Sequence, residues 1–405
     1  MADVVPDLIP VTPLLAISRR DPYPGFAKLR ALSPVFLTPH GLAVITGHAA
    51  ATAALKDPRL ERFSVFELSS RGLPPEPRRD RVAALSRATV LFQNPPDHGR
   101  LRAFMSRAFQ PKIIEDLRGR LEALVAKLLD AAAARGRFDF VADFAQAFPV
   151  QVIAELIGVP KKDWRACIDW SNTLAPTIDA VIPRERMDRA IDVTHAFADY
   201  LGRLFAARRA KPAKDLVTKL VGAYDGGAEL SEDELVSNVI TLFVAGHETT
   251  TGLLGNALVE LHKDPALARR LAREPERIGP FVEEVLRFES PIQLSARIAK
   301  EDLTIDGVHV PRGATAWVFL GAANRDPSRF DAPDTFDAAR DPNPHLAFGS
   351  GPHFCLGAPL ARMEAEVALR QFLTRFPRWK LVEPELALRP TMTLRSYQRL
   401  TVETA

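Results

Sequence analysis

The chain is predicted to be mainly α-helical with small β-sheets, and three observations support this fold class. Residues 95–288 and 357–376 form its helical bulk, because apolar side chains recur there with helical periodicity. One run, 231–262, continues without a break and begins with a capping box. Short β-rich pieces near 35–46 and 303–320, and others close to the C-terminus, are interrupted by Gly and Pro.

The first quarter of the chain alternates short elements. A helix is expected from Pro22 to Leu32, followed by a β-hairpin over 35–46 and a second helix from Gly47 to Lys56. The segment 64–89 contains scattered prolines and arginines, so we expect it to be mostly loop.

Helices then dominate up to residue 288. Asp97 is expected to cap a helix that continues to about Phe109, and Pro111 begins another that reaches about Arg135. Gly158 is expected to end a helix. The other expected helices span 141–157, 161–173, 184–209, 265–273 and 276–288. Within the longest run, 239–245 is apolar on all sides and is expected to cross the core.

Composition sets limits on the class of protein. The net charge of +3 over 405 residues does not indicate a nucleic-acid partner. Two distant cysteines do not indicate a disulfide framework. The N-terminus lacks a basic segment followed by an apolar run, and no membrane anchor is evident, so a soluble cytoplasmic protein is expected. No linker divides the sequence, and a single domain over 1–405 is expected.

One cysteine lies in a segment suited to binding a haem iron. Cys355 ends the turn-rich stretch 348–357 and directly precedes a predicted helix, whose N-terminal N–H groups and dipole favour a thiolate. Glycines in this stretch allow the backbone to approach a flat, bulky group. Such a thiolate is a suitable axial ligand for haem. A cysteine without this context is usually a buried apolar side chain, which we expect of Cys167.

The pattern Phe-x-x-Gly-x-x-x-Cys-x-Gly is filled by Phe348, Gly351, Cys355 and Gly357. It resembles the haem-ligand loop of the cytochrome P450 family, and the resemblance covers most of the chain. The cofactor implied is haem b (iron protoporphyrin IX), bound to Cys355 and contacted by Phe348 and Gly349. The fold implied is a triangular prism, with haem between the long central helix and the helix after the cysteine loop.

The long helix carries Ala245-Gly246-His247-Glu248-Thr249-Thr250, which places an acid beside a threonine in apolar surroundings. One interpretation is a buried acid whose hydrogen bonds are supplied by a neighbouring helix. The run also resembles the oxygen-activating segment of the family, which implies that Thr249 hydrogen-bonds the activated oxygen and Glu248 delivers protons. His247 is expected to point elsewhere, and the glycine and threonines predict a local bulge.

Glu284 and Arg287 lie one helical turn apart, and an exposed pair of this kind stabilises little. They match the Glu-x-x-Arg of the family, a structural lock behind the cysteine loop. A further arginine is expected in the coil from Asn324 to Phe336. We assign this trio to folding and haem retention.

Haem propionates need charge-assisted hydrogen-bond donors. Four basic residues match positions at which the family supplies them: His98, Arg102, Arg297 and His353. Any one of them alone would be an ordinary surface cation, but all four occur at the expected spacing.

The resemblance also indicates a largely apolar substrate pocket, in which Gln293 and Ser295 are possible orienting donors. Its expected lining residues are Val90, Phe92, Thr241, Val244, Ala245, Ile292, Gln293, Leu294, Ser295 and Leu394. Such a pocket suits a terpenoid, steroid, fatty acid or aromatic without choosing among them.

The resemblance therefore implies a monomeric bacterial haem-thiolate monooxygenase that hydroxylates or epoxidises a hydrophobic small molecule with dioxygen. The family's motifs extend over most of the chain and leave no flavin or iron–sulfur module, so electrons are expected from a separate ferredoxin and its reductase. Four basic residues could form the surface that docks this ferredoxin, or they could simply be solvated: Arg100, Arg107, Lys112 and Arg362.

Two alternatives stay open. One is a peroxide-driven peroxygenase or nitric-oxide reductase on the same scaffold, against which Glu248 argues. The other is a non-catalytic haem-binding sensor or carrier-protein recruiter, against which the Glu248–Thr249 pair argues more weakly.

Overall fold

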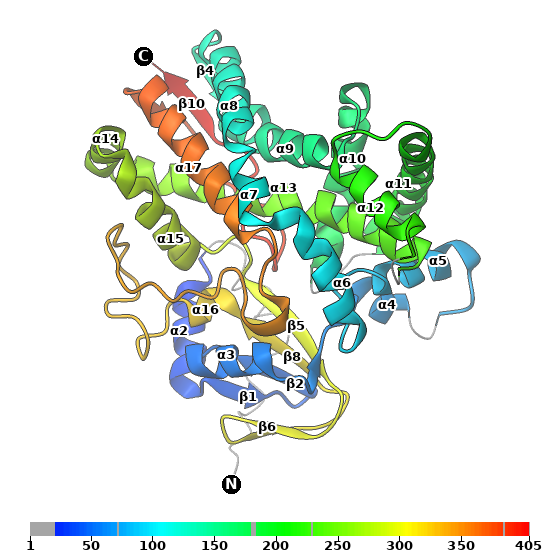
Figure 1. Cartoon of the computed structure of the whole chain (residues 1–405). Coiled ribbons are helices and arrows are strands. Elements are labelled where there is room, and N and C mark those ends of the chain that lie inside the picture. The colour runs from blue at the N-terminus through cyan, green and yellow to red at the C-terminus, as the bar shows by residue number, and fades with distance from the viewer. Residues whose placement is uncertain (1–20, 71–72, 180–183, 228–229, 384, 405) are drawn as a thin grey trace. The chain divides into compact units, whose positions relative to one another are not determined.

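The computed structural model describes residues 21–404 apart from 71–72, 180–183, 228–229 and 384 (Figure 1). The N-terminal segment considered above for targeting signals lies outside these residues. The chain divides into two compact units. Unit 1 comprises 1–61, 114–145 and 249–405, and unit 2 comprises 62–113 and 146–248.

Unit 1 contains all ten strands of the described residues. Its main sheet has the order β1-β2-β8-β5-β3. The strands are β1 (Val35–Leu37), β2 (Leu42–Ile45), β3 (Leu60–Glu61), β5 (Leu294–Ala299) and β8 (Thr315–Phe319). The predicted hairpin is confirmed, since β1 and β2 pair antiparallel with Val35 opposite Ile45. β8 then pairs parallel to β2 and antiparallel to β5.

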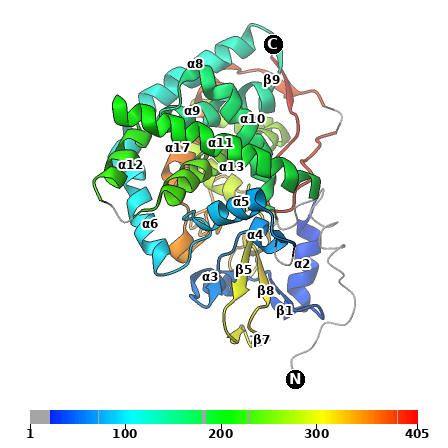
Figure 2. The same ribbon diagram turned by 90° about the vertical axis from the view of Figure 1, so that its right-hand side faces the viewer.

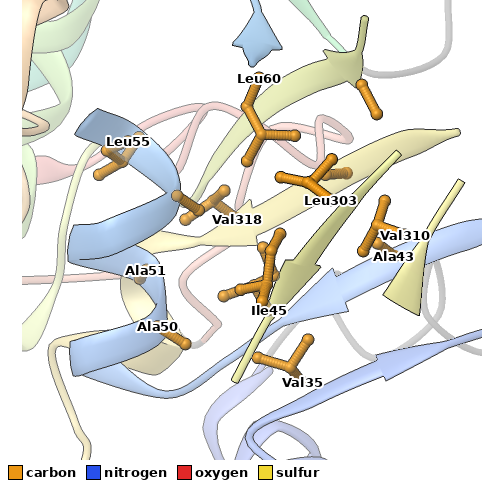
Figure 3. Packing of buried hydrophobic residues seen from close by; sticks show 14 of the residues in the cluster. Val35, Ala43, Ile45, Ala50, Ala51, Leu55, Leu60, Leu303, Val310 and Val318 are labelled. Carbon is orange, nitrogen blue, oxygen red and sulfur yellow. The ribbon is translucent and has the colours of Figure 1, made fainter. Parts of the chain in front are cut away.

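Helix α3 (His48–Lys56) covers one face of this sheet. Figure 3 shows Ala51 and Leu55 of α3 on one side and Ile45 and Val318 of the sheet on the other. These side chains belong to one buried apolar cluster. Because burial of apolar area is the main favourable term in folding, this cluster fixes α3 against the sheet.

Two smaller sheets complete unit 1. One joins β4 (Arg137–Asp139), β10 (Thr401–Thr404) and β9 (Trp379–Leu381), all antiparallel. The other is the hairpin of β6 (Leu303–Ile305) and β7 (Val308–Val310). Asp306 and Gly307 form its two-residue turn with φ values of 48° and 79°, as the Asp-Gly pair favours.

The helices of unit 1 build its other half. They are α2 (Tyr23–Leu32), α8 (Arg118–Ala133), α14 (Pro265–Arg273), α15 (Ile278–Phe288), α16 (Leu320–Ala323) and α17 (Ala358–Arg375). In Figure 1, α17 lies beside α8, α14 and α15, with which it packs. Buried Leu360, Val367 and Phe372 belong to the apolar side of α17.

Unit 2 has helices and no strand among its described residues. Its helices are α4 (Val65–Ser70), α5 (Pro77–Arg87), α6 (Asp97–Ser106), α9 (Ala147–Ile157), α10 (Trp164–Leu174), α11 (Arg184–Ala210) and α12 (Leu216–Asp225). Figure 2 shows α11 beside α10 and α12, in agreement with their contacts. Gly158 ends α9 with φ 96°, and an added Cβ there would clash with Asp215 at 2.2 Å.

Short helical turns connect several of these elements. They are η1 (Arg107–Phe109), η2 (Val141–Ala145), η3 (Lys161–Asp163), η4 (Ala175–Ile178), η5 (Pro275–Arg277) and η6 (Gly351–His353). Helix α7 (Pro111–Glu115) begins in unit 2 and ends in unit 1.

The longest helix, α13 (Glu232–Lys263), also passes from unit 2 into unit 1. Its capping box is confirmed, because the Ser231 N–H donates to the Glu234 carboxylate at 2.7 Å and the Glu234 N–H donates to Ser231 Oγ at 3.1 Å. Its apolar middle is buried at Val239, Phe243 and Val244, whereas Ala245 is exposed. The expectation that this stretch is buried on every side was therefore only partly correct.

Other sequence expectations need correction. The segment 64–89 is not mostly loop, because α4 and α5 occupy much of it. Pro77 occupies the first turn of α5, where proline needs no intrahelical partner, and Glu76 caps two backbone N–H groups. The helix expected over 111–135 is broken into α7 and α8, and α12 was missed. Asp97 is the first residue of α6 and not its cap, which is Pro96.

No helix within the described ranges has the length and apolar character that a membrane crossing requires.

Candidate functional site

The loop that carries Cys355 is shaped by glycines and joined directly to a helix. Gly349 and Gly351 both have φ 72°. An added Cβ at Gly351 would lie 2.9 Å from Lys56 Cγ, so this glycine lets the loop touch the end of α3. The Cys355 N–H donates to the Phe348 carbonyl at 3.0 Å, and α17 begins at Ala358. The predicted position of Cys355 before a helix N-terminus is confirmed.

The two cysteines have different surroundings. Cys355 is exposed and Cys167 is buried. Burial, with a smaller contribution from Asp163, raises the pKa of the Cys167 thiol to about 12. Cys167 is therefore a protonated core thiol, as expected, and Cys355 is the accessible sulfur.

The residues of unit 1 fit a haem. A Cβ at Gly357 would lie 3.9 Å from the Cys355 sulfur, in ordinary van der Waals contact, so this residue borders the sulfur. Arg297 on β5 is 2% exposed and donates to Ser295 Oγ at 2.7 Å. His353 ends η6 within the cysteine loop. A thiolate suits iron, and a guanidinium and an imidazole suit carboxylates, which is the donor set that haem requires.

Unit 2 holds the other two predicted propionate donors on α6. His98 is 3% exposed and Arg102 is half-buried. Burial, then the positive charges of Arg102 and Arg62, lower the pKa of His98. A neutral His98 donates an N–H, while the arginines provide charge.

Arg62 was not recognised in the sequence, since no motif marks it. Its Nε donates to the Leu91 carbonyl at 3.0 Å and its own N–H donates to Asn94 Oδ1 at 2.8 Å. Its guanidinium lies 5.5 Å from the centre of the Phe92 ring. Burial lowers the pKa of Arg62 to about 10, and its influence on His98 places it in the same cationic group.

The Glu284–Arg287 lock is present and fully buried. Two guanidinium nitrogens of Arg287 each donate to a Glu284 carboxylate oxygen at 2.7 Å, and both side chains are 0% exposed. The third member of the trio is Arg340, whose Nε donates to Glu284 at 3.3 Å. It does not lie between Asn324 and Phe336 as expected, because coil has no regular period from which to predict contacts.

Within α13, His247 is a packed histidine, as expected. Its Nδ1 lies 3.1 Å from Ser171 Oγ and 3.0 Å from the Phe243 carbonyl oxygen. Its Nε2 lies 3.5 Å from Glu248 Oε1. Glu248 is 3% exposed and Thr249 is half-buried.

The predicted bulge at Gly246 was wrong, because α13 is continuous from Glu232 to Lys263. An added Cβ at Gly246 would lie 3.1 Å from Ile153 Cδ1. The glycine therefore allows α9 to approach α13 closely.

The two threonines after Thr249 are engaged within unit 1. Thr251 Oγ1 donates to the Ala145 carbonyl at 3.1 Å, and Thr250 hydrogen-bonds Glu364. Glu364 lies on α17 and is 2% exposed, and burial raises its pKa to about 8. The sequence reasoning missed this acid, although a Glu within the apolar run of α17 was a visible signal.

The expected pocket residues fall in both units. In unit 2, the Val90 N–H donates to Asn238 Oδ1 at 2.9 Å, and the Thr89 and Thr241 hydroxyls lie 2.7 Å apart. These contacts fix the segment after α5 to α13. Val244 is buried, and Phe92 packs against Arg62.

In unit 1, Ile292 and Leu394 form an isolated antiparallel bridge, and Leu294 is buried on β5. Gln293 donates from Nε2 to the Tyr23 hydroxyl at 3.2 Å and to the Ser290 carbonyl at 2.8 Å. Both of its N–H donors are therefore used within the unit, which removes it as an orienting donor.

Comparison with known proteins agrees with this arrangement. The family model described as Cytochrome P450 matches residues 35–398. The biotin biosynthesis cytochrome P450 of Bacillus subtilis is 37% identical over 387 residues, covering 95% of this chain and 96% of the relative. The cytochrome P450 monooxygenase PikC of Streptomyces venezuelae is 38% identical over 392 residues, covering 94% and 91%.

Solved structures agree as well. P450BioI in complex with an acyl carrier protein ligated to hexadec-9Z-enoic acid has a TM-score of 0.88 and 35% identity, covering 97% of this chain and 100% of that chain. CalO2 has a TM-score of 0.89 and 34% identity, covering 96% and 97%. The fold is thus the P450 fold. The chain belongs to the cytochrome P450 family and is a P450 monooxygenase, an oxidoreductase of the haem-thiolate class.

Proposed function

We propose that this chain is a haem-b monooxygenase in which Cys355 is the thiolate ligand and the whole of 1–405 acts as one catalytic domain. The observation that carries the proposal is the contrast between the two cysteines. Cys355 is exposed at the junction of a glycine loop and a helix, whereas Cys167 is buried. The bound haem would supply the chemistry of dioxygen activation.

His98, Arg102, Arg297 and His353 are proposed to hold the haem propionates, with Phe348 and Gly349 shaping the thiolate loop. The buried Arg297 is oriented by Ser295, which accepts its hydrogen bond at 2.7 Å. His98 acts as a neutral donor because its pKa is lowered. Arg62 is a further cation of the same group.

Glu248 and Thr249 are the proposed catalytic pair. Glu248 is almost fully buried and lies 3.5 Å from His247 Nε2, and its proposed role is to pass protons toward the oxygen site. Thr249, the next residue of α13, would present its hydroxyl to dioxygen. Replacing the hydroxyl should uncouple electron use from product formation.

The substrate is proposed to be hydrophobic and of moderate size, with Ser295 as the remaining candidate for an orienting hydroxyl. A fatty-acyl chain carried on an acyl carrier protein is the second candidate. P450BioI has been solved with such a partner and is 35% identical to this chain. Binding of the acyl carrier protein form but not of the free acid would favour the second candidate.

Electrons are proposed to come from a separate ferredoxin and its reductase. Two of the four basic residues expected to dock it are engaged internally. Arg100 pairs with Glu234 at 2.5 Å, and Arg362 pairs with Glu283 at 2.7 Å. The docking role therefore falls mainly on Arg107 and Lys112.

The test of the haem ligand compares C355S with C167S. The reduced wild-type protein with carbon monoxide should show the red-shifted Soret band of a thiolate-ligated haem. C355S should lose that band while C167S keeps it. Retention of the band in folded C355S would overturn the assignment.

The catalytic pair is tested with T249A and with T173S as a control at a half-buried threonine of α10. T249A should still consume reductant and dioxygen but release peroxide in place of product. T173S should match wild type. An unchanged product yield per electron in T249A would contradict the role of Thr249.

A further inference from the structure

A second glutamate of α15 connects this helix to the cysteine loop. Glu283 accepts two hydrogen bonds from Arg362 of α17, from Nε at 2.7 Å and from Nη2 at 2.9 Å. His345 Nε2 lies 3.1 Å from the same carboxylate. One carboxylate thus joins α15, α17 and the segment that leads into the loop.

The hydrogen bonds assign the tautomer of His345. The Ala347 N–H donates to His345 Nδ1 at 3.3 Å, so Nδ1 is an acceptor and the ring proton is on Nε2. That proton faces Glu283. The His345 ring therefore contacts both partners, one through each nitrogen, and Arg362 is the guanidinium paired with the carboxylate.

Both partners of Glu283 touch the residue that begins the cysteine loop. The Arg362 guanidinium carbon lies 4.6 Å from the centre of the Phe348 ring, and the His345 ring centre lies 6.1 Å from it. The Phe348 carbonyl in turn accepts the Cys355 N–H at 3.0 Å. The chain of contacts from Glu283 to the backbone of Cys355 is continuous.

Electrostatic interactions also connect Glu283, Arg362 and Cys355. The hydrogen-bonded Glu283 carboxylate raises the pKa of Arg362, and the Cys355 sulfur raises it further. The guanidinium is thus within electrostatic reach of the sulfur. A bare cation there would withdraw electron density from the thiolate, and the Glu283 carboxylate offsets it.

We propose that Glu283, His345 and Arg362 form a positioning cluster that fixes the Cys355 loop and sets the electron donation of its sulfur to the haem iron. The inference rests on the proposed role of Cys355. It also gives Arg362 a role inside the protein in place of the partner docking suggested by its sequence position.

The test is the ferric/ferrous midpoint potential of the purified holoprotein, measured for E283Q and R362Q. Loss of the carboxylate should make the potential more positive, because Arg362 then acts on the sulfur unopposed. Loss of the guanidinium should make it more negative. E276Q removes one exposed carboxylate of the same unit and should leave the potential unchanged.

A merely structural cluster would not move the potential in opposite directions. Shifts of the same sign, or no shift in either variant, would overturn the inference. If E283Q does not retain haem, the variant R362K tests the inference in its place. It keeps the charge but loses the two-point hydrogen bond, so its carbon-monoxide complex should lose the thiolate band faster on warming than that of wild type, and a wild-type rate would overturn the proposal. Failure of the proposed function can be told apart from failure of this inference, because the wild-type protein itself would then lack the thiolate band.

Discussion

Two successive glutamates of α15 perform different tasks. Glu284 is 0% exposed and binds the equally buried Arg287, whereas the Glu283 side chain is 31% exposed and binds Arg362, which is 33% exposed. The geometry of the two ion pairs is nearly the same. The difference in burial predicts that loss of the first pair destabilises the protein strongly, whereas the second is exposed enough to be changed at a small cost in stability.

The largest expected effect is the loss of the buried lock. In R287A the Glu284 carboxylate would remain buried without its main partner, which should lower the free energy of unfolding by about 3–5 kcal/mol. The measurement is urea unfolding, together with the haem content of the purified protein.

The matched control for R287A is R277A. Arg277 pairs with Glu274 at the same i,i+3 spacing, but the two side chains are 52% and 38% exposed. Its loss should change stability by less than about 1 kcal/mol. Equal effects of the two substitutions would show that burial does not distinguish these pairs.

A buried carboxyl without an arginine sharpens the comparison. Burial raises the pKa of Glu364 to about 8, so the folded protein binds a proton that the unfolded chain releases above about pH 4.5. Stability should therefore fall as pH rises from about 4.5 to about 8, by at most about 1.4 kcal/mol per pH unit.

E364Q, which carries no ionisable group at this position, should flatten that slope, and the exposed-site variant E276Q should keep it. Thermal unfolding across this pH range is the measurement. A slope of wild-type size in E364Q would mean that Glu364 does not titrate in this window.

The smallest effect is expected at Glu283. Partial burial opposes its ionisation, but the hydrogen bonds from Arg362 and His345 hold its pKa at about 2. Its contribution to stability is therefore present above about pH 4.5 and is lost as pH falls toward 2. Acid unfolding of E283Q should depend less on pH in this window than that of wild type. An identical acid profile would indicate that the pair with Arg362 does not persist in solution.

Local rules predicted much of the fold and part of the candidate site. The capping box at Ser231, the Asp-Gly turn at Asp306 and the glycine that ends α9 are each encoded by a few neighbouring residues. Pro77 misled the prediction because proline breaks a helix interior but is favoured in a first turn. Arg340 was missed because a contact made by coil depends on the whole path of the chain.

By itself, the sequence determined the helical class, the cysteine loop and the acid–threonine pair of α13, since these features depend on residue type and short spacing. Only the tertiary structure decided which carboxylate meets which cation and how deeply each pair is buried. Glu283 and Glu284 are the same residue type on the same helix, and they differ only in the side chains that the fold places around them. Those surroundings set the cost of charge and thereby the task of each residue.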